Sequence, residues 1–183
     1  LTSLNVSGCT ALTSLNCNFN QLTSLNVSGH TSLTSLFCHD NQLTSLNISG
    51  CASLTSLDCH DNQLTSLDAS GTAIKEMWPS NFNENPYITL DFSDCKSLEI
   101  FDYASFFSGT KLYETLITLN LSGCTSLKEV DCSGCGGQLT SLNVTGCTSL
   151  TELYCSSNQL TSLDVSTCRV LEALNCGSNK IRS

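Results

Sequence analysis

Positively charged side chains are scarce in this sequence. Its 183 residues include 7 Lys and Arg against 16 Asp and Glu, a formal net charge of −9, and no cation precedes Lys75. Nucleic acids and anionic membranes bind basic patches, so we expect neither as a partner. No apolar run approaches the roughly 20 residues that cross a bilayer, and no secretory leader is recognisable, so membrane insertion is not expected.

Catalytic motifs are also missing. The sequence contains no phosphate-binding loop, no nucleophile elbow and no HExxH helix, so we expect no enzymatic activity and no cofactor. Cysteine, by contrast, is abundant at 13 residues. An odd number of cysteines in a chain of this length weakens the idea of a disulfide scaffold.

A 21-residue sequence repeats along the chain. LTSLNVSGCTALTSLNCNFNQ (1–21) is followed by LTSLNVSGHTSLTSLFCHDNQ (22–42) and LTSLNISGCASLTSLDCHDNQ (43–63). About eight copies can be traced, and they start at residues 1, 22, 43, 64, 87, 116, 139 and 160, with an irregular section at 72–115. We therefore expect residues 1–183 to form a single repeat domain. Because the chain begins directly with repeat sequence, we expect it to be a fragment of a larger protein.

Each copy contains two similar halves, LxxLxVxxCxx and LxxLxCxxNx. Alternation of apolar and polar residues in both halves predicts a short strand with one buried face. The spacing of 10 or 11 residues leaves no room for a helix beside each strand. We expect a β-rich solenoid with two short parallel strands per turn, two parallel sheets and little or no helix, whose eight turns make a rod of roughly 40 Å.

The repeats resemble leucine-rich repeats of the nested 21-residue type called IRREKO. Its pattern LxxLxCxxNxLxxLDLxxN is matched by LTSLDCHDNQLTSLDAS (54–70), and the resemblance covers nearly the whole chain. Such repeats are typical of bacterial surface or secreted proteins that bind other macromolecules. The resemblance therefore implies a monomeric module at the cell surface or outside the cell, with a protein or glycan ligand.

Repeat position accounts for every cysteine. Six lie at the inward position of the second strand, where a thiol acts as a small apolar residue, and six follow the first strand in a turn. Asn20, Asn41 and their equivalents follow the second strand, and we expect them to hydrogen-bond turn backbone groups from one turn to the next. Cys132 and Cys135 form a CxxC, which elsewhere indicates redox or zinc chemistry, but both occupy framework positions.

Two rows of side chains are expected to point outward. The outward row of the first strands, here called the first face, is nearly uniform, from Ser3-Asn5-Ser7 to Ser162-Asp164-Ser166. The outward row of the second strands, the second face, is varied. It reads Ser14-Asn16-Asn18, Ser35-Phe37-His39, Ser56-Asp58-His60, Glu76-Trp78-Ser80, Ile100-Asp102-Ala104, Glu129-Asp131-Ser133, Glu152-Tyr154-Ser156 and Ala173-Asn175-Gly177.

Specific recognition requires varied chemistry with a few aromatic anchors, so the second face is the expected ligand-binding surface. Its candidate residues are Phe37, His39, Asp58, His60, Trp78, Asp102, Asp131, Glu152 and Tyr154. The alternative is drift on a surface without a ligand.

The irregular section at 72–115 is rich in aromatic residues. Phe92, Phe101 and Tyr103 fall on inward positions and are expected in the core, whereas Phe107 and Tyr113 have no framework role and are further candidates for ligand contact. Long insertions in solenoids often serve binding, and the alternative is a packed bulge that covers an irregular turn.

The tetrad His-Asp-Asn-Gln occurs at 39–42 and again at 60–63, so His39 and His60 occupy the same position in adjacent copies. Two imidazoles about 5 Å apart can trap a divalent ion, but metal sites usually have three or four ligands. Copying of the repeat explains the duplication, and we expect a solvated surface without a metal. Other hypotheses are a structural or surface-lattice element, an ice-binding array, and calcium held by Asn47, Asp68 and Asp91.

Overall fold

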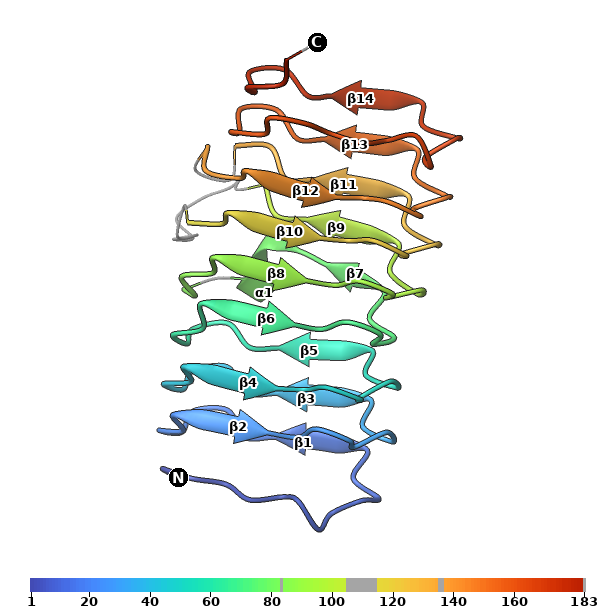
Figure 1. The fold of residues 1–183 in the computed structure, drawn as a ribbon. Helices are drawn as coiled ribbons and strands as arrows, with labels where there is room; N and C mark the ends of the chain where they lie inside the picture. Colours follow the sequence, from blue (N-terminus) through green and yellow to red (C-terminus); the bar gives the residue numbers. More distant parts are fainter. Residues whose placement is uncertain (83, 105–114, 135–136, 183) are drawn as a thin grey trace.

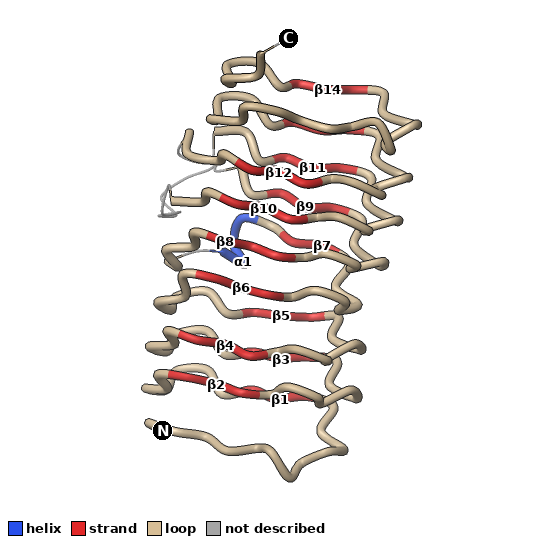
Figure 2. Tube along the Cα trace, in the orientation of Figure 1, coloured by secondary structure: helices blue, strands red, loops and turns tan. Residues whose placement is uncertain are grey.

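The structure, a computed structural model, describes residues 1–82, 84–104, 115–134 and 137–182. Within them the chain winds as a parallel β-solenoid whose turns stack from the N-terminus to the C-terminus (Figure 1). Short strands alternate with turns and loops, which make up most of the chain (Figure 2). The predicted fold class, a leucine-rich repeat coil with almost no helix, is confirmed.

The strands form two layers on opposite sides of the coil. The layer that carries the first face contains β2 (Ser24–Asn26), β4 (Ser45–Asn47), β6 (Ser66–Asp68), β8 (Thr89–Asp91), β10 (Thr118–Asn120) and β12 (Ser141–Asn143). The layer that carries the second face contains β1 (Ser14–Asn16), β3 (Ser35–Phe37), β5 (Ser56–Asp58), β7 (Glu76–Met77), β9 (Ile100–Asp102), β11 (Glu129–Asp131), β13 (Glu152–Tyr154) and β14 (Ala173–Asn175). Strands expected at 3–5 and 162–164 do not form, since both segments lie in the outermost turns.

Burial of the central leucine of each strand holds the layers together. Leu25, Leu36 and Leu90 are at most 2% exposed, while their neighbours in the strand point outward. A single turn cannot enclose these side chains, so burial depends on the turns above and below. The register aligns identical repeat positions, as in the pairs Leu36↔Leu57 and Leu119↔Leu142.

Each layer is divided into two sheets, whereas the sequence predicts one continuous sheet per layer. The second-face layer consists of β1-β3-β5 and β14-β13-β11-β9-β7, and the first-face layer consists of β2-β4 and β12-β10-β8-β6. The division falls between the third and fourth turns. The fourth copy loses its pattern after Gly71, and its second strand, β7, has only two residues.

The irregular fourth and fifth turns surround a cluster of aromatic rings. Helix α1 (Pro79–Phe82) directs Phe82 inward, where it packs against Tyr87, Phe92, Phe101 and Tyr103. All five are at most 2% exposed, so the predicted core positions of Phe92, Phe101 and Tyr103 are confirmed. No helix in the described part of the chain has the length and apolar character to span a bilayer.

Two residues expected on the second face are placed otherwise. Ala104 is 3% exposed and belongs to the interior. Ser80 lies within α1 rather than in a strand, because β7 ends at Met77 and Pro79 begins the helix.

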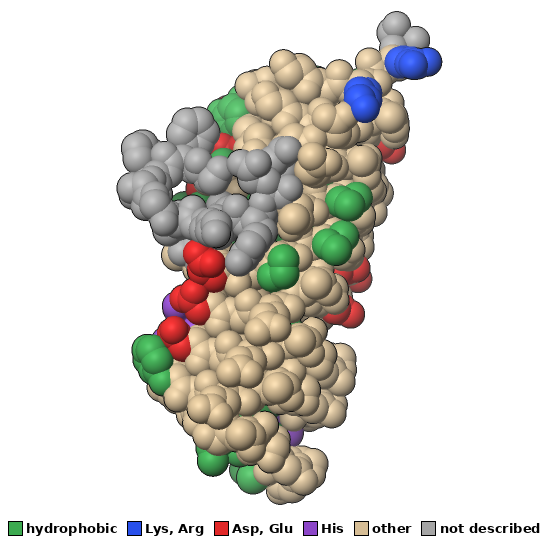
Figure 3. Space-filling view, turned by 90° about the vertical axis from the view of Figure 1, so that its left-hand side faces the viewer, with side chains coloured by type: hydrophobic (Ala, Val, Ile, Leu, Met, Phe, Trp, Pro, Cys, Tyr) green, Lys and Arg blue, Asp and Glu red, His purple; other side chains and the backbone are tan. Residues whose placement is uncertain are grey.

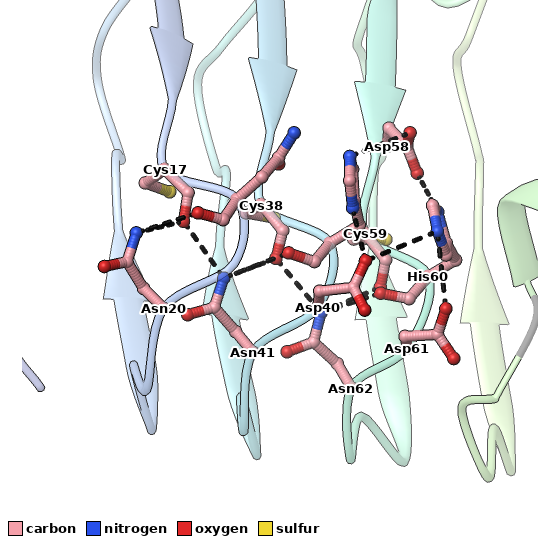
Figure 4. A network of polar contacts seen from close by, with 12 residues as sticks. Cys17, Asn20, Cys38, Asp40, Asn41, Asp58, Cys59, His60, Asp61 and Asn62 are labelled. Carbon is pink, nitrogen blue, oxygen red and sulfur yellow. Dashed lines mark hydrogen bonds and ion pairs between the residues drawn. The ribbon is translucent and has the colours of Figure 1, made fainter. Parts of the chain in front are cut away.

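Asparagine side chains connect the turns along one edge of the coil, which faces the viewer in Figure 3. The side-chain amide of Asn62 donates to the carbonyl oxygens of Cys38 and Cys59, each at 3.1 Å, and its Oδ1 accepts from the Leu43 N–H at 2.9 Å. Asn41 makes the equivalent bonds one turn earlier, and the row is visible in Figure 4. The predicted role of the asparagine row is therefore confirmed.

Cysteine thiols connect the turns along the opposite edge. The Sγ of Cys51, Cys95, Cys124 and Cys147 donates to a backbone carbonyl of the preceding turn at 3.0–3.2 Å. His30 takes the same place in the second turn, with its Nε2 3.1 Å from the Val6 oxygen. Eleven of the described cysteines, all but Cys132, are free thiols, and Cys9, in the first turn, is exposed. These cysteines are framework residues, and as hydrogen-bond donors they do more than fill space.

The buried thiols predict a loss of stability in alkaline solution. Burial raises the pKa of Cys59 to about 11 and those of Cys147 and Cys155 to about 12, whereas a thiol in an unfolded chain has a pKa of about 8.5. Between these values the unfolded state has lost protons that the native state retains. We therefore expect full stability below about pH 8.5 and a steady decrease above it.

Urea unfolding at a series of pH values measures this decrease. The control is a native-state alkylation experiment at neutral pH, in which Cys9 reacts and Cys59, Cys147 and Cys155 react only after unfolding. A free energy of unfolding that stays constant up to about pH 11 contradicts the burial of these thiols in their neutral form.

Candidate functional site

The uniformity of the first face has a structural cause. The Oδ1 atoms of Asn26, Asn47 and Asn143 accept hydrogen bonds from the backbone N–H two residues further on, at 2.9–3.1 Å. Asp68 makes the same bond to the Ser70 N–H at 3.0 Å. These side chains close the turn after each strand, so the repeat retains Asn or Asp there without any ligand.

On the second face, the third copy replaces this bond by a contact between side chains. Asp58 stands where the first copy has Asn16, and its Oδ1 lies 2.5 Å from Nδ1 of His60. His39, on the preceding turn, stacks on His60 with ring centroids 4.4 Å apart and an interplanar angle of 12°. The Nδ1 of His39 lies 2.8 Å from Asp40 Oδ2. The structure thus brings three of the predicted residues, His39, Asp58 and His60, into one cluster beside Phe37.

This His-Asp cluster borders an open groove at the asparagine edge. The groove has a volume of about 610 Å³, and its lining includes Phe19, Asp40, Asp61 and Glu84. These four residues share one turn position and have φ of 50–53°, which directs their side chains away from the core. Acidic and histidine side chains gather on this edge in Figure 3.

Trp78 lies in a second groove, of about 330 Å³, where the second-face layer is divided. The groove is lined by Ser56 of β5, by Glu76 of β7 and by Lys75, which precedes β7. Trp78 is 42% exposed, and its Nε1 donates to Glu76 Oε2 at 3.1 Å. This hydrogen bond holds a large apolar surface in a fixed orientation toward solvent, as a binding anchor requires.

Four further predicted residues lie on adjacent strands. Asp102 on β9 pairs in register with Asp131 on β11, which pairs with Tyr154 on β13, and Glu152 lies on β13 as well. The Tyr154 hydroxyl donates to Glu152 Oε2 at 2.7 Å. Burial and, to a smaller extent, the nearby Asp131 charge raise the pKa of Asp102.

The predicted residues thus fall into three groups along the second face: the His-Asp cluster with Phe37, the Trp78 groove, and the acidic stretch with Tyr154. Phe107 and Tyr113 lie outside the described residues. Phe19, which is 77% exposed and contacts His39 edge to face at 5.2 Å, is a residue that the repeat pattern misses. A comparison of equivalent repeat positions would identify Phe19 as unusual, because the next two copies have Asp at its position.

The geometry and the sequence comparisons agree on the class of protein. Residues 31–72 match the family model for Leucine Rich repeats (2 copies), and residues 149–171 match the model for Leucine Rich Repeat. These segments are leucine-rich repeats, and proteins built from such repeats typically act as non-enzymatic protein-binding modules. None of the curated proteins matches the sequence.

Among solved structures, the functional domain of InlJ from Listeria monocytogenes, which includes a cysteine ladder, is similar to this chain. The identity is 32% and the TM-score 0.61, over 94% of this chain and 36% of the InlJ chain. This chain therefore spans about a third of the length of the InlJ chain. A leucine-rich repeat protein of Leptospira interrogans matches at 19% identity over 97% of this chain and 70% of its own, with a TM-score of 0.28.

Proposed function

We propose that residues 1–183 form one solenoid domain of about eight repeats that binds a macromolecule, protein or glycan, through its second face. The observation that carries the proposal is the contrast between the faces. On the first face, Asn and Asp are retained because they close turns, as Asn26 does for Ser28. On the second face, Asp102 and Asp131 close turns in the same way. Phe37, Trp78 and Tyr154 stand at the equivalent position in other copies and present aromatic side chains instead.

A protein ligand with basic groups is the partner that this face suits best. Asp58, Asp102, Asp131 and Glu152 lie along it beside the aromatic residues, and Lys and Arg are few. Charge complementarity speeds association and selects the partner, while aromatic anchors supply most of the binding energy. Stacking on Trp78 or Tyr154 suits a glycan, the second candidate. The resemblance of the repeats to bacterial surface proteins supports an extracellular or cell-surface location and a non-enzymatic role.

Two matched triple variants test the proposal. The labelled chain is applied to an array of purified extracellular protein domains and to a glycan array, and the ligands found are titrated. We expect Phe37→Ser/Trp78→Ser/Tyr154→Ser to weaken binding by at least about 30-fold, as for hot-spot residues. The first-face control, Asn26→Ala/Asn47→Ala/Asn143→Ala, should bind within about 3-fold of the native chain. Equal losses in both variants, with both folded by circular dichroism, contradict the assignment of the face.

A further inference from the structure

We propose that the His-Asp cluster is a binding site for a divalent transition-metal ion of the Zn²⁺ type, with His39, Asp40, His60 and Asp61 as ligands and Asp58 as the residue that orients the His60 imidazole and lies beside that of His39. The site lies at the junction of the second face and the asparagine edge. It is independent of the macromolecular ligand proposed above, and it reverses the sequence-based expectation of a merely solvated surface.

The potential ligand atoms already lie near one another. Asp40 Oδ2 is 2.8 Å from His39 Nδ1 and 4.0 Å from His60 Nε2, and Asp61 Oδ2 is 3.4 Å from the same Nε2. One ligand atom from each of His39, Asp40 and His60 lies within 4.8 Å of the others. Tetrahedral ligands at 2.0–2.1 Å from zinc are about 3.3 Å apart, so small side-chain rotations bring these atoms into range.

The two imidazole rings are stacked head to tail, so that one nitrogen of each ring faces the proposed metal and the other faces Asp58. His39 Nδ1 and His60 Nε2 both lie near Asp40, on the side of the proposed metal. The other two nitrogens lie near Asp58, since His60 Nδ1 is 2.5 Å from its Oδ1 and His39 Nε2 is 3.9 Å from its Oδ2. A carboxylate that accepts from the far nitrogen of a metal-bound imidazole fixes its tautomer and orientation. Figure 4 shows Asp40, Asp58 and Asp61 around His60.

Asp58 is combined with two imidazoles only in the third copy. Its position holds Asn16 in the first copy and Phe37 in the second, and it holds Asp102 and Asp131 in the fifth and sixth. Neither Asp102 nor Asp131 has a His two residues further on, whereas Asp58 is followed by His60 and lies next to His39 of the preceding copy. The combination of this carboxylate with both imidazoles therefore occurs at one place in the coil.

The surroundings admit a cation. Asp40 and Asp61 line the open groove of about 610 Å³, so an ion from solvent reaches them directly. The side chains of His39 and His60 are 16% and 27% exposed, which gives the ligands partial shelter from water. No Lys or Arg precedes residue 75, and the chain carries a net charge of −9. Two imidazoles with carboxylates favour Zn²⁺ or Co²⁺ over Ca²⁺ and Mg²⁺, which select oxygen ligands alone.

Titration of the full chain with ZnCl₂ and, separately, with CoCl₂ tests the proposal. We expect saturable one-to-one binding by calorimetry and a cobalt spectrum without the thiolate charge-transfer band. Binding should be lost in His39→Asn and in His60→Asn, and should weaken by about 10-fold or more in Asp58→Asn, which removes only the orienting carboxylate. The matched controls are Asp68→Asn, an acid of the first face, and Cys9→Ser, the exposed thiol; both should bind as the native chain does.

The variants change half-buried surface positions, and native circular dichroism confirms that each is folded. The proposal is overturned by the absence of saturable binding, by binding that His60→Asn leaves unchanged, or by a cobalt spectrum that shows thiolate ligation lost in Cys9→Ser. An effect of Asp58→Asn no larger than that of Asp68→Asn removes the orienting role of Asp58 and with it the site as described.

Discussion

Replacing Asn62 with alanine lowers the free energy of unfolding by about 3 kcal/mol. Asn62 is 6% exposed, and its amide donates to the carbonyl oxygens of Cys38, Cys59 and His60 while its Oδ1 accepts from the Leu43 N–H. Alanine leaves the Leu43 N–H without its partner in the interior. The carbonyl oxygens of Cys38 and Cys59 each lose one of two side-chain amide bonds and keep those from Asn41 and Asn85. Chemical denaturation followed by far-UV circular dichroism measures the change.

The matched control is Asn47→Ala. Asn47 is exposed and bonds only to Ser49, through its backbone N–H and its hydroxyl, so the variant should lose less than about 1 kcal/mol. Both substitutions remove the same side chain from the same turn of the coil. Asn62 connects neighbouring turns of the coil, whereas Asn47 only stabilises the local backbone turn after its strand. Similar losses of unfolding free energy for the two variants contradict this distinction.

Replacing Phe101 with alanine costs more, about 4 kcal/mol, because it leaves a cavity in the aromatic cluster. Phe101 is fully buried, with ring centroids 5.4 Å from Phe92 and 5.5 Å from Phe82. The surrounding rings belong to β9, α1 and the segment after β8, so the cluster connects the two layers on the C-terminal side of the division. Thermal and urea unfolding of the variant measure the loss.

Trp78→Ala is the control for Phe101→Ala, since it removes an even larger ring at the surface. Trp78 is 42% exposed, and its indole contacts Glu76 rather than the cluster. We expect a loss of about 1 kcal/mol or less. If Trp78→Ala destabilises the chain as much as Phe101→Ala, Trp78 is a structural residue and its assignment to the binding surface is wrong.

Much of the fold follows from the sequence because the period of the repeat constrains every turn in the same way. Leu36, Cys38 and Asn41 recur at fixed positions, and each position has one environment, so alternation and spacing suffice to predict inward strands and a bonded asparagine row. The division of the sheets is not predictable in this way. It depends on how Met77, Pro79 and Phe82 pack where the pattern fails, and no other copy supplies a precedent.

The candidate site is predictable only in part, because the repeat pattern identifies neighbouring residues but does not determine how their side chains are oriented. Outward alternation identifies Phe37, His39, Asp58 and His60 as neighbours on the second face. It does not determine rotamers, and the stacking of His39 on His60 depends on them. Asp40 and Phe19 lie in the turn beyond the strand, where positive φ rather than alternation sets the direction of the side chain.

The central claim is that the two faces of the solenoid have separate roles, one structural and one for recognition. Photo-crosslinking tests it most directly, with benzoylphenylalanine placed in turn at Tyr154 and at Asn143, which lie on β13 and β12 in opposite layers. Each chain is irradiated with a protein ligand found on the arrays. Adducts from position 154 and none from position 143 are the predicted result, whereas adducts confined to position 143 contradict the claim.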